Sequence, residues 1–259
     1  MRAVSVHRDV IVVTSLLWQT TATAIRSGEE AMLIDSPYFP AELELLPAVL
    51  AEADFDPTAL LATHGDFDHL LGPLAFPALS LGVGEETALR LRAEPGVAQR
   101  ELRDADADHY VERAGPLALG QAQALPVPGH LGLGDRELEL HPAEGHTADG
   151  AAVFARWCGV LVCGDYLSNV ELPTISGGGS LAAYRATLAR LAALVGDAET
   201  VVPGHGSPQG RDAALRTLEA DLGYLDALER GERRPALPAG RDSVRQRMVH
   251  AENLERVGA

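Results

Sequence analysis

The sequence predicts an α/β fold in which two central β-sheets lie between outer layers of helices, an αββα arrangement. Short apolar runs typical of strands alternate with segments whose leucines recur at helical spacing, and this succession occurs in each half of the chain. In addition, four polar loops that follow strand-like runs place glycine beside histidine or aspartate. Glycine permits tight turns there, so these loops are expected to form one rim at the strand ends.

Length and composition favour one compact domain spanning residues 1–259. The chain is 46% hydrophobic, which supports a sizeable core and argues against disorder. Its formal net charge of −16 argues against nucleic acid as a partner, because such binding depends on cationic contacts. All 21 basic residues are arginine, so no lysine is present to act as a nucleophile or to form a Schiff base.

We expect a cytoplasmic protein that acts on a small-molecule substrate and has no membrane partner. Residues 1–9 lack the apolar core of a signal peptide, and no apolar run reaches membrane-spanning length. Cys158 and Cys163 would point to opposite faces of one strand, so buried free thiols are expected rather than a disulfide. The last helix could pack on the domain or on a second subunit, so a homo-oligomer remains open.

In the N-terminal half, apolar residues predict strands at 10–17, 21–26 and 30–35. A helix is predicted over 40–53, where four apolar residues recur at helical spacing. The run 59–62 reads as a strand that leads directly into the first polar loop, and 79–82 as another short strand. The charged segments 85–92 and 97–107 are predicted to be helices.

Residues 100–128 are the least patterned part of the chain. The acidic run 104–109 is typical of a solvated face. We expect the segment 85–130 to form a cap over the rim of polar loops, where it would influence the choice of substrate.

In the C-terminal half, strands are predicted at 137–141, 151–156, 160–164 and 200–202. A helix over 180–195 has one apolar stripe and begins at Ser180, a residue type that caps helix N-termini. Two further helices, 208–229 and 242–256, are joined by the proline- and glycine-rich residues 231–240.

The most informative segment is Thr63–His69, which contains two imidazoles and two carboxylates. A strand that ends in such a cluster presents several metal ligands from one short turn. The mixture of carboxylate and imidazole suits zinc, iron or manganese better than magnesium or calcium. Three more loops follow apolar runs and supply His146, Asp165 and His205.

From about Val10 to Gly206 the chain resembles the metallo-β-lactamase superfamily. The family's first motif is usually His-x-His-x-Asp-His; here it reads His64-Gly65-Asp66-Phe67-Asp68-His69, so an aspartate replaces the second histidine. The other landmarks stand in family order. The resemblance implies a four-layer αββα metallo-β-lactamase sandwich and a hydrolase of the glyoxalase II or lactonase type.

The resemblance also implies two divalent metal ions, zinc first and manganese or iron as alternatives. The first ion would bind His64, Asp66 and His146, the second Asp68, His69 and His205, and both would bind Asp165. The early aspartate of the family corresponds to Asp35, which would support the site from behind the ligands.

Asp66 leaves two interpretations open. As a ligand, it would bring a third carboxylate to the site beside Asp68 and Asp165, and the first ion would become less Lewis-acidic. Alternatively, Asp66 is not a ligand and the first position is weak or empty.

The resemblance implies hydrolysis of a small ester, thioester or lactone by a hydroxide that bridges the metals. Asp68 would orient the attacking water. Tyr166 would either donate a hydrogen bond to the developing oxyanion or simply pack beside the site. The alternative is an oxidoreductase resembling persulfide dioxygenases, with one iron held by His64, His146 and Asp165. A non-catalytic module is disfavoured because the other ligands of the pattern are present.

Overall fold

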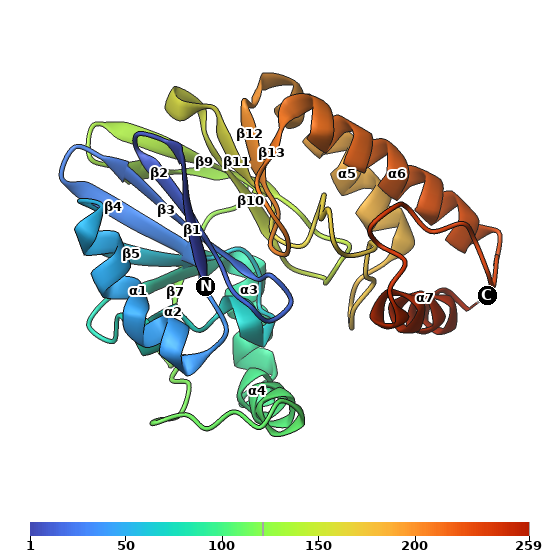
Figure 1. Cartoon of the computed structure of the whole chain (residues 1–259), viewed down its shortest axis with the longest axis horizontal. Coiled ribbons are helices and arrows are strands. Elements are labelled where there is room, and N and C mark those ends of the chain that lie inside the picture. The colour runs from blue at the N-terminus through green and yellow to red at the C-terminus, as the bar shows by residue number, and fades with distance from the viewer. Residues whose placement is uncertain (121, 259) are drawn as a thin grey trace.

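The computed structural model describes residues 1–120 and 122–258. Two sheets lie against each other, and helices cover the outer face of each (Figure 1). The predicted αββα layering is therefore confirmed.

The N-terminal sheet has seven strands in sequential order. Its first four strands are antiparallel, and the last three continue parallel to the fourth. The strands are β1 (Arg2–His7), β2 (Val10–Thr14), β3 (Thr21–Ser27), β4 (Glu30–Asp35), β5 (Pro57–Ala62), β6 (Leu81–Gly84) and β7 (Gln123–Leu125).

The C-terminal sheet has six strands in the order β13-β12-β11-β10-β9-β8. Only β11 and β12 pair in parallel, so their carboxyl ends open at the same edge. The strands are β8 (Gly129–Leu133), β9 (Arg136–Pro142), β10 (Ala151–Ala155), β11 (Val160–Val162), β12 (Thr200–Val202) and β13 (Gln209–Gly210).

The alternation of side chains along the strands builds three apolar layers. In β2, Val10 and Val12 join the core between the sheets, whereas Ile11 and Val13 join the core beneath the N-terminal helices. In β10, Val153 packs between the sheets and Phe154 packs against the C-terminal helices. Both sheets are thus buried on two faces, which explains why several strands read as continuous apolar runs.

The helices divide between the two outer faces (Figure 1). The N-terminal sheet carries α1 (Pro40–Glu52), α2 (Gly72–Ala75), α3 (Glu85–Ala93) and α4 (Val97–Asp108), and the C-terminal sheet carries α5 (Leu181–Asp197) and α6 (Arg211–Glu229). Ser180 caps α5 as predicted, since its hydroxyl accepts a hydrogen bond from Ala183 N.

The last helix, α7 (Val244–Val257), fastens a loop that spans residues 168–175. Asn253 is fully buried; it accepts a hydrogen bond from Ile175 N at 2.8 Å and donates one to Pro173 O at 2.7 Å. Before the helix, Arg241 pairs with buried Asp221 and donates to two carbonyls of the same loop. These contacts are polar and buried, so they fix the loop in one position.

Most predicted elements match the structure to within a few residues, and the differences have local causes. Strands β1 and β8 were not predicted, because they lie at sheet edges and are only partly buried. The helix expected from residue 208 begins at Arg211, since residues 209–210 pair with β12. Within 100–128, the structure continues α4 to Asp108 and adds β7 to the sheet.

The acidic run 104–109 is not wholly solvated. Asp106 is buried, where it accepts a hydrogen bond from Tyr38 at 2.7 Å and pairs with Arg113 at 2.7 Å. Cys158 and Cys163 are free and buried as expected. Within residues 1–120 and 122–258, none of the helices is sufficiently long and apolar to span a membrane.

Candidate metal centre

All seven predicted ligands converge where loops of both sheets meet. His64 follows β5, and Asp66, Asp68 and His69 lie in or beside the 3-10 turn η1 (Phe67–His69). The other three come from the C-terminal half: His146 from the β9–β10 connection, Asp165 after β11 and His205 after β12.

Three groups of potential ligand atoms lie within 4.8 Å of one another. One contains His64, Asp66 and His146; another contains Asp68, His69 and His205. These are the two sets expected from the family pattern. A third group joins them through His64, His69 and Asp165.

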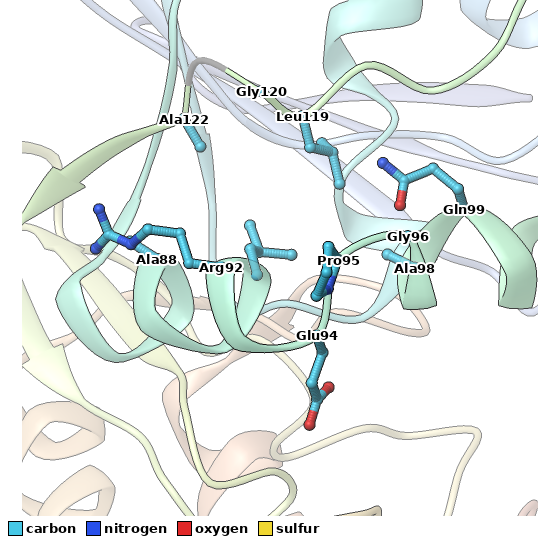
Figure 2. Close-up of a pocket in the computed structure, with 11 residues that line it drawn as sticks. Ala88, Arg92, Glu94, Pro95, Gly96, Ala98, Gln99, Leu119, Gly120 and Ala122 are labelled. Atoms are coloured by element: carbon cyan, nitrogen blue, oxygen red, sulfur yellow. The ribbon is translucent and has the colours of Figure 1, made fainter.

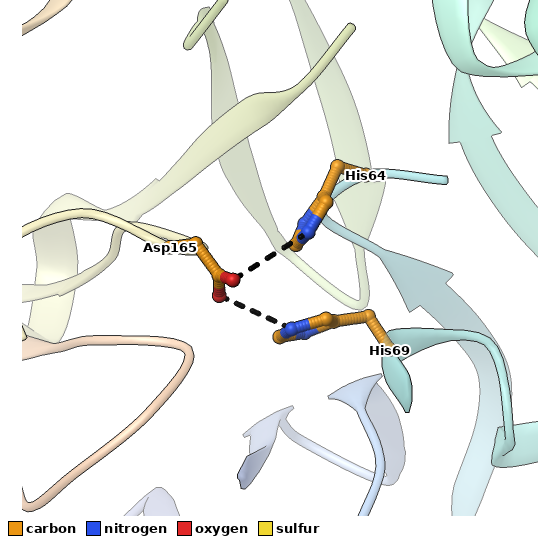
Figure 3. Close-up of side chains that lie close together, drawn as sticks. All are labelled: His64, His69 and Asp165. Carbon is orange, nitrogen blue, oxygen red and sulfur yellow. Dashed lines mark ion pairs between the residues drawn. The ribbon is translucent and has the colours of Figure 1, made fainter. Parts of the chain in front are cut away.

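Asp165 faces one histidine of each set, His64 and His69 (Figure 3). Its Oδ1 is 3.1 Å from His69 Nε2, while its Oδ2 is 3.4 Å from His146 Nε2 and 3.3 Å from His205 Nε2. His64 Nε2 is 3.8 Å from the same Oδ2. One carboxylate therefore faces imidazoles from both halves of the chain.

The protein orients every imidazole of the site through its Nδ1 atom. His146 donates to Thr174 O at 2.8 Å and His205 to Trp18 O at 3.1 Å, because a carbonyl can only accept. His69 Nδ1 lies 3.0 Å from the carboxylate of Asp35. With Nδ1 protonated, the neutral ring directs an unprotonated Nε2 toward the centre, as metal-binding histidines do.

The fourth imidazole, His64, is also oriented through its Nδ1 atom, but Thr63 links it to the carboxylate of Asp35. Thr63 donates its hydroxyl proton to Asp35 at 2.9 Å, so its oxygen accepts from His64 Nδ1 at 3.0 Å. Asp35 therefore supports both His64 and His69, in line with the role expected for it.

The donor set fits divalent metal ions. Of the five buried side-chain atoms without a hydrogen-bond partner among the residues that the structure describes, two, His64 Nε2 and Asp165 Oδ1, lie in this site. Buried polar atoms are rarely left unpaired, and here both belong to groups that ligate metals. Imidazole nitrogens and single carboxylate oxygens suit zinc, manganese or iron.

Charge pairing inside the site shifts several pKa values. Burial lowers the pKa of His146, but its hydrogen bond with Asp66 and the charge of Asp165 raise it to about 9. Burial likewise lowers the pKa of His205, and the carboxylate of Asp165 raises it to about 10. Without metal, these imidazoles therefore hold protons that ions would have to displace.

Two residues of the site were missed by sequence reasoning. Arg90 of α3 lies 2.8 Å from Asp66 Oδ1 and 2.9 Å from Asp149 Oδ1. Asp149 also accepts hydrogen bonds from Gly65 N and Thr87 Oγ1, each at 2.8 Å. No local motif marks either residue, because their partners lie far away in the sequence.

Tyr166 lies behind His146. Its side chain is buried, and its hydroxyl accepts a hydrogen bond from His146 N at 2.9 Å. This contact positions the His146 loop, and burial raises the pKa of the phenol. The oxyanion role expected of Tyr166 stays a prediction without support from this geometry.

The site opens on the side of Asp66, whose side chain is 22% exposed, whereas that of His69 is fully buried. Trp18 stands beside His205 and packs edge-on against Phe67 and His109. A separate pocket of about 290 Å³ lies between α3, α4 and residues 119, 120 and 122 (Figure 2). None of the seven predicted ligands is among the described residues that line that pocket.

Gly204→Ala tests the close approach of the backbone to Asp165. A Cβ at Gly204 would collide with Asp165 Oδ1 and come within 2.9 Å of His69 Cε1, so the carboxylate must move. We expect zinc affinity to fall by about 10- to 100-fold in a chelator competition, as for other changes beside metal ligands. Gly223→Ala in α6 is the control, since a Cβ there meets nothing within 4 Å. Equal zinc affinity in the two variants would contradict the assignment of Asp165 as a metal ligand.

The raised pKa values predict how the metal-free protein responds to pH. His146 and His205 have folded-state pKa values of about 9 and 10, above the ordinary value of 6.5. Their protonation therefore stabilises the fold fully below pH 6.5, and this stability is lost as pH rises toward about 10. Thermal unfolding with chelator should show a falling Tm over this window, and the zinc-loaded protein a smaller fall. If Tm falls equally with pH in the metal-free and the zinc-loaded protein, the raised pKa values do not govern this stability.

Comparisons with known proteins agree with this geometry. The family model described as metallo-beta-lactamase superfamily matches residues 16–205. A metallo-beta-lactamase family protein from Thermus thermophilus superposes with a TM-score of 0.70 at 19% identity, covering 98% of this chain and 96% of that one. A metallo-beta-lactamase from Pontibacter korlensis gives a TM-score of 0.63 at 17% identity, covering 84% and 97%.

A search of the curated proteins gave no match. The similarities to solved structures are too remote in sequence to show more than a shared fold. The family match, however, spans most of the chain and ends at His205, the last of the predicted ligands. The chain belongs to the metallo-beta-lactamase superfamily.

Proposed function

We propose that the protein is a metal-dependent hydrolase of a small ester, thioester or lactone. The observation that carries this proposal is the position of Asp165, which faces both ligand sets at once. Such a carboxylate suits two ions held close together, with zinc as the first candidate and manganese or iron as alternatives. Two adjacent ions, when bound, would supply Lewis acidity and lower the pKa of a water molecule between them.

Asp68 is the residue best placed to act on that water. Its carboxylate lies 3.4 Å from His205 Nε2 and 3.9 Å from His69 Nε2, and its side chain is only 10% exposed. A carboxylate in this position can accept a proton from the attacking water and fix its direction. We therefore assign Asp68 both a ligand role and an orienting role.

Arg245 of the C-terminal helix α7 is the candidate for contact with the substrate. Its guanidinium lies 4.8 Å from the Trp18 ring centroid, and the Trp18 carbonyl accepts a hydrogen bond from His205. It is 50% exposed and only loosely paired with Glu171, at 3.5 Å. We propose that it binds an anionic group of the substrate.

The dioxygenase alternative would use only His64, His146 and Asp165. It would leave Asp68, His69 and His205 as a second complete ligand group without a role. A buried group of this kind costs free energy, so the geometry favours two ions over one.

Metal analysis and a substrate panel test the proposal together. Protein purified without added metal is analysed for its elements, then assayed with small thioesters, lactones and aryl esters. Two equivalents of metal and turnover of at least one class are expected. One equivalent of iron, with oxygen consumption in the presence of a persulfide, would replace hydrolysis by the alternative.

Asp68→Ala should reduce hydrolysis by roughly 10²- to 10⁴-fold, because the water loses its proton acceptor and orienting group. Metal content and circular dichroism are measured on the same samples, so loss of activity can be separated from loss of fold. The control is Asp104→Ala, which removes an exposed carboxylate of α4. Near-normal turnover by a fully loaded Asp68→Ala variant would remove Asp68 from the mechanism.

Arg245→Ala should raise KM for an anionic thioester roughly tenfold and leave kcat unchanged, since one charge-assisted contact is lost. A neutral thioester of the same size should show no change. Arg247→Ala, an exposed arginine of the same helix, serves as the control. If both arginine variants behave alike with both substrates, Arg245 has no specific role in binding.

A further inference from the structure

The two oxygens of Asp66 have different partners. Oδ1 accepts a contact from Arg90 Nη1 at 2.8 Å. Oδ2 faces the interior of the site, 3.3 Å from His146 Nε2 and 3.8 Å from His64 Nε2. Only one oxygen of this carboxylate is therefore directed toward the position that an ion in the first set would occupy.

Arg90 is itself held in place by Asp149. The carboxylate of Asp149 is buried, and it binds Arg90, Thr87 and the backbone N–H of Gly65. Because Gly65 directly precedes Asp66, Asp149 fixes both the guanidinium and the loop that carries its partner. A Cβ on Gly65 would lie 3.1 Å from Asp149 Oδ2 and 3.3 Å from Arg90 Nη1, which shows how closely these groups pack.

The pairing changes what Asp66 can offer a metal. A free carboxylate is an anionic group with two donor atoms, whereas an imidazole is neutral and offers one. When Arg90 binds Oδ1, one donor atom of Asp66 remains, and the guanidinium, which Asp66 shares with Asp149, offsets part of its negative charge. Asp66 then offers the same number of donor atoms as an imidazole, with a reduced negative charge, at the position where the family motif usually has histidine.

We propose that Arg90 is a positioning residue that makes Asp66 a one-atom ligand of reduced charge in place of the missing histidine. The inference rests on the proposed metal centre, but it concerns binding and not turnover. Arg90 acts through Asp66, so its contribution must depend on which residue occupies position 66.

A double-mutant cycle measured by zinc binding tests this dependence. The four proteins are the wild-type chain, Arg90→Gln, Asp66→His and the double variant, each titrated with zinc against a chromophoric chelator. The binding step that His146→Ala abolishes is assigned to the first set. Arg92→Gln is the control, because it removes an exposed arginine from the same helix.

The expected effects have opposite signs. In the wild-type background, Arg90→Gln should weaken zinc binding at the first set by about 10- to 100-fold, because Asp66 loses its support. In the Asp66→His background, the same change should strengthen binding, since the guanidinium has lost Asp66, keeps only its pairing with Asp149 and repels the ion. Arg92→Gln should change neither.

An effect of the same sign in both backgrounds, or none in the wild-type background, would overturn the inference. Strengthening in the wild-type background would show that Arg90 acts only as a distant positive charge. Zinc binding at the second set is the internal check on folding, and it should stay constant in all variants. If the wild-type chain binds no zinc, the proposed metal centre itself fails, whereas failure of the cycle alone removes only the role of Arg90.

Discussion

The arrangement of the site depends on the carboxylate of Asp165. A buried carboxylate is costly unless charged or polar groups surround it, and here four imidazoles do so. They come from both halves of the chain, so the two sheets must bring their loops to the same edge. The backbone adapts to this requirement: Gly204 N donates to Gly164 O at 2.6 Å, and any side chain at Gly204 would occupy the place of the carboxylate.

The imidazoles in turn need acceptors that set their orientation, and these come from distant segments. The loop 168–175 supplies Thr174 O to His146, and this loop is fastened by Arg241, Gln246 and Asn253. The C-terminal segment thus supports the metal centre although it contributes none of the predicted ligands. This support explains why the buried side of α7 carries amide side chains, which make these hydrogen bonds, beside an imidazole and apolar side chains.

Sequence reasoning could predict which residues come together at the site because each stands beside a local signal. His64, His146 and His205 follow apolar runs and have glycine neighbours, so their strand-end positions are readable within a few residues. Arg90 carries no such signal, since it lies in an ordinary charged helix and meets Asp66 only through the fold. The expectation that Asp66 adds a third carboxylate to the site therefore left out the guanidinium beside it. Tyr166 shows a related difficulty: its adjacency to Asp165 in sequence gives no sign that its hydroxyl accepts a hydrogen bond from His146 N.

The replacement of histidine by Asp66 also shapes the mouth of the site, since Asp66 is its most exposed predicted ligand. On this side Arg90 lies 3.7 Å from Glu94, and burial together with the charge of Asp66 raises the pKa of Glu101 on α4. The helices α3 and α4 therefore present carboxylates around a guanidinium that is already paired. Arg245, by contrast, is half-exposed and stands over Trp18. Carboxylates therefore surround the paired guanidinium on the side of α3 and α4, whereas α7 presents the half-exposed guanidinium of Arg245. If Arg245 binds an anionic substrate group as proposed, the carboxylates of α3 and α4 would repel that group and Arg245 would attract it.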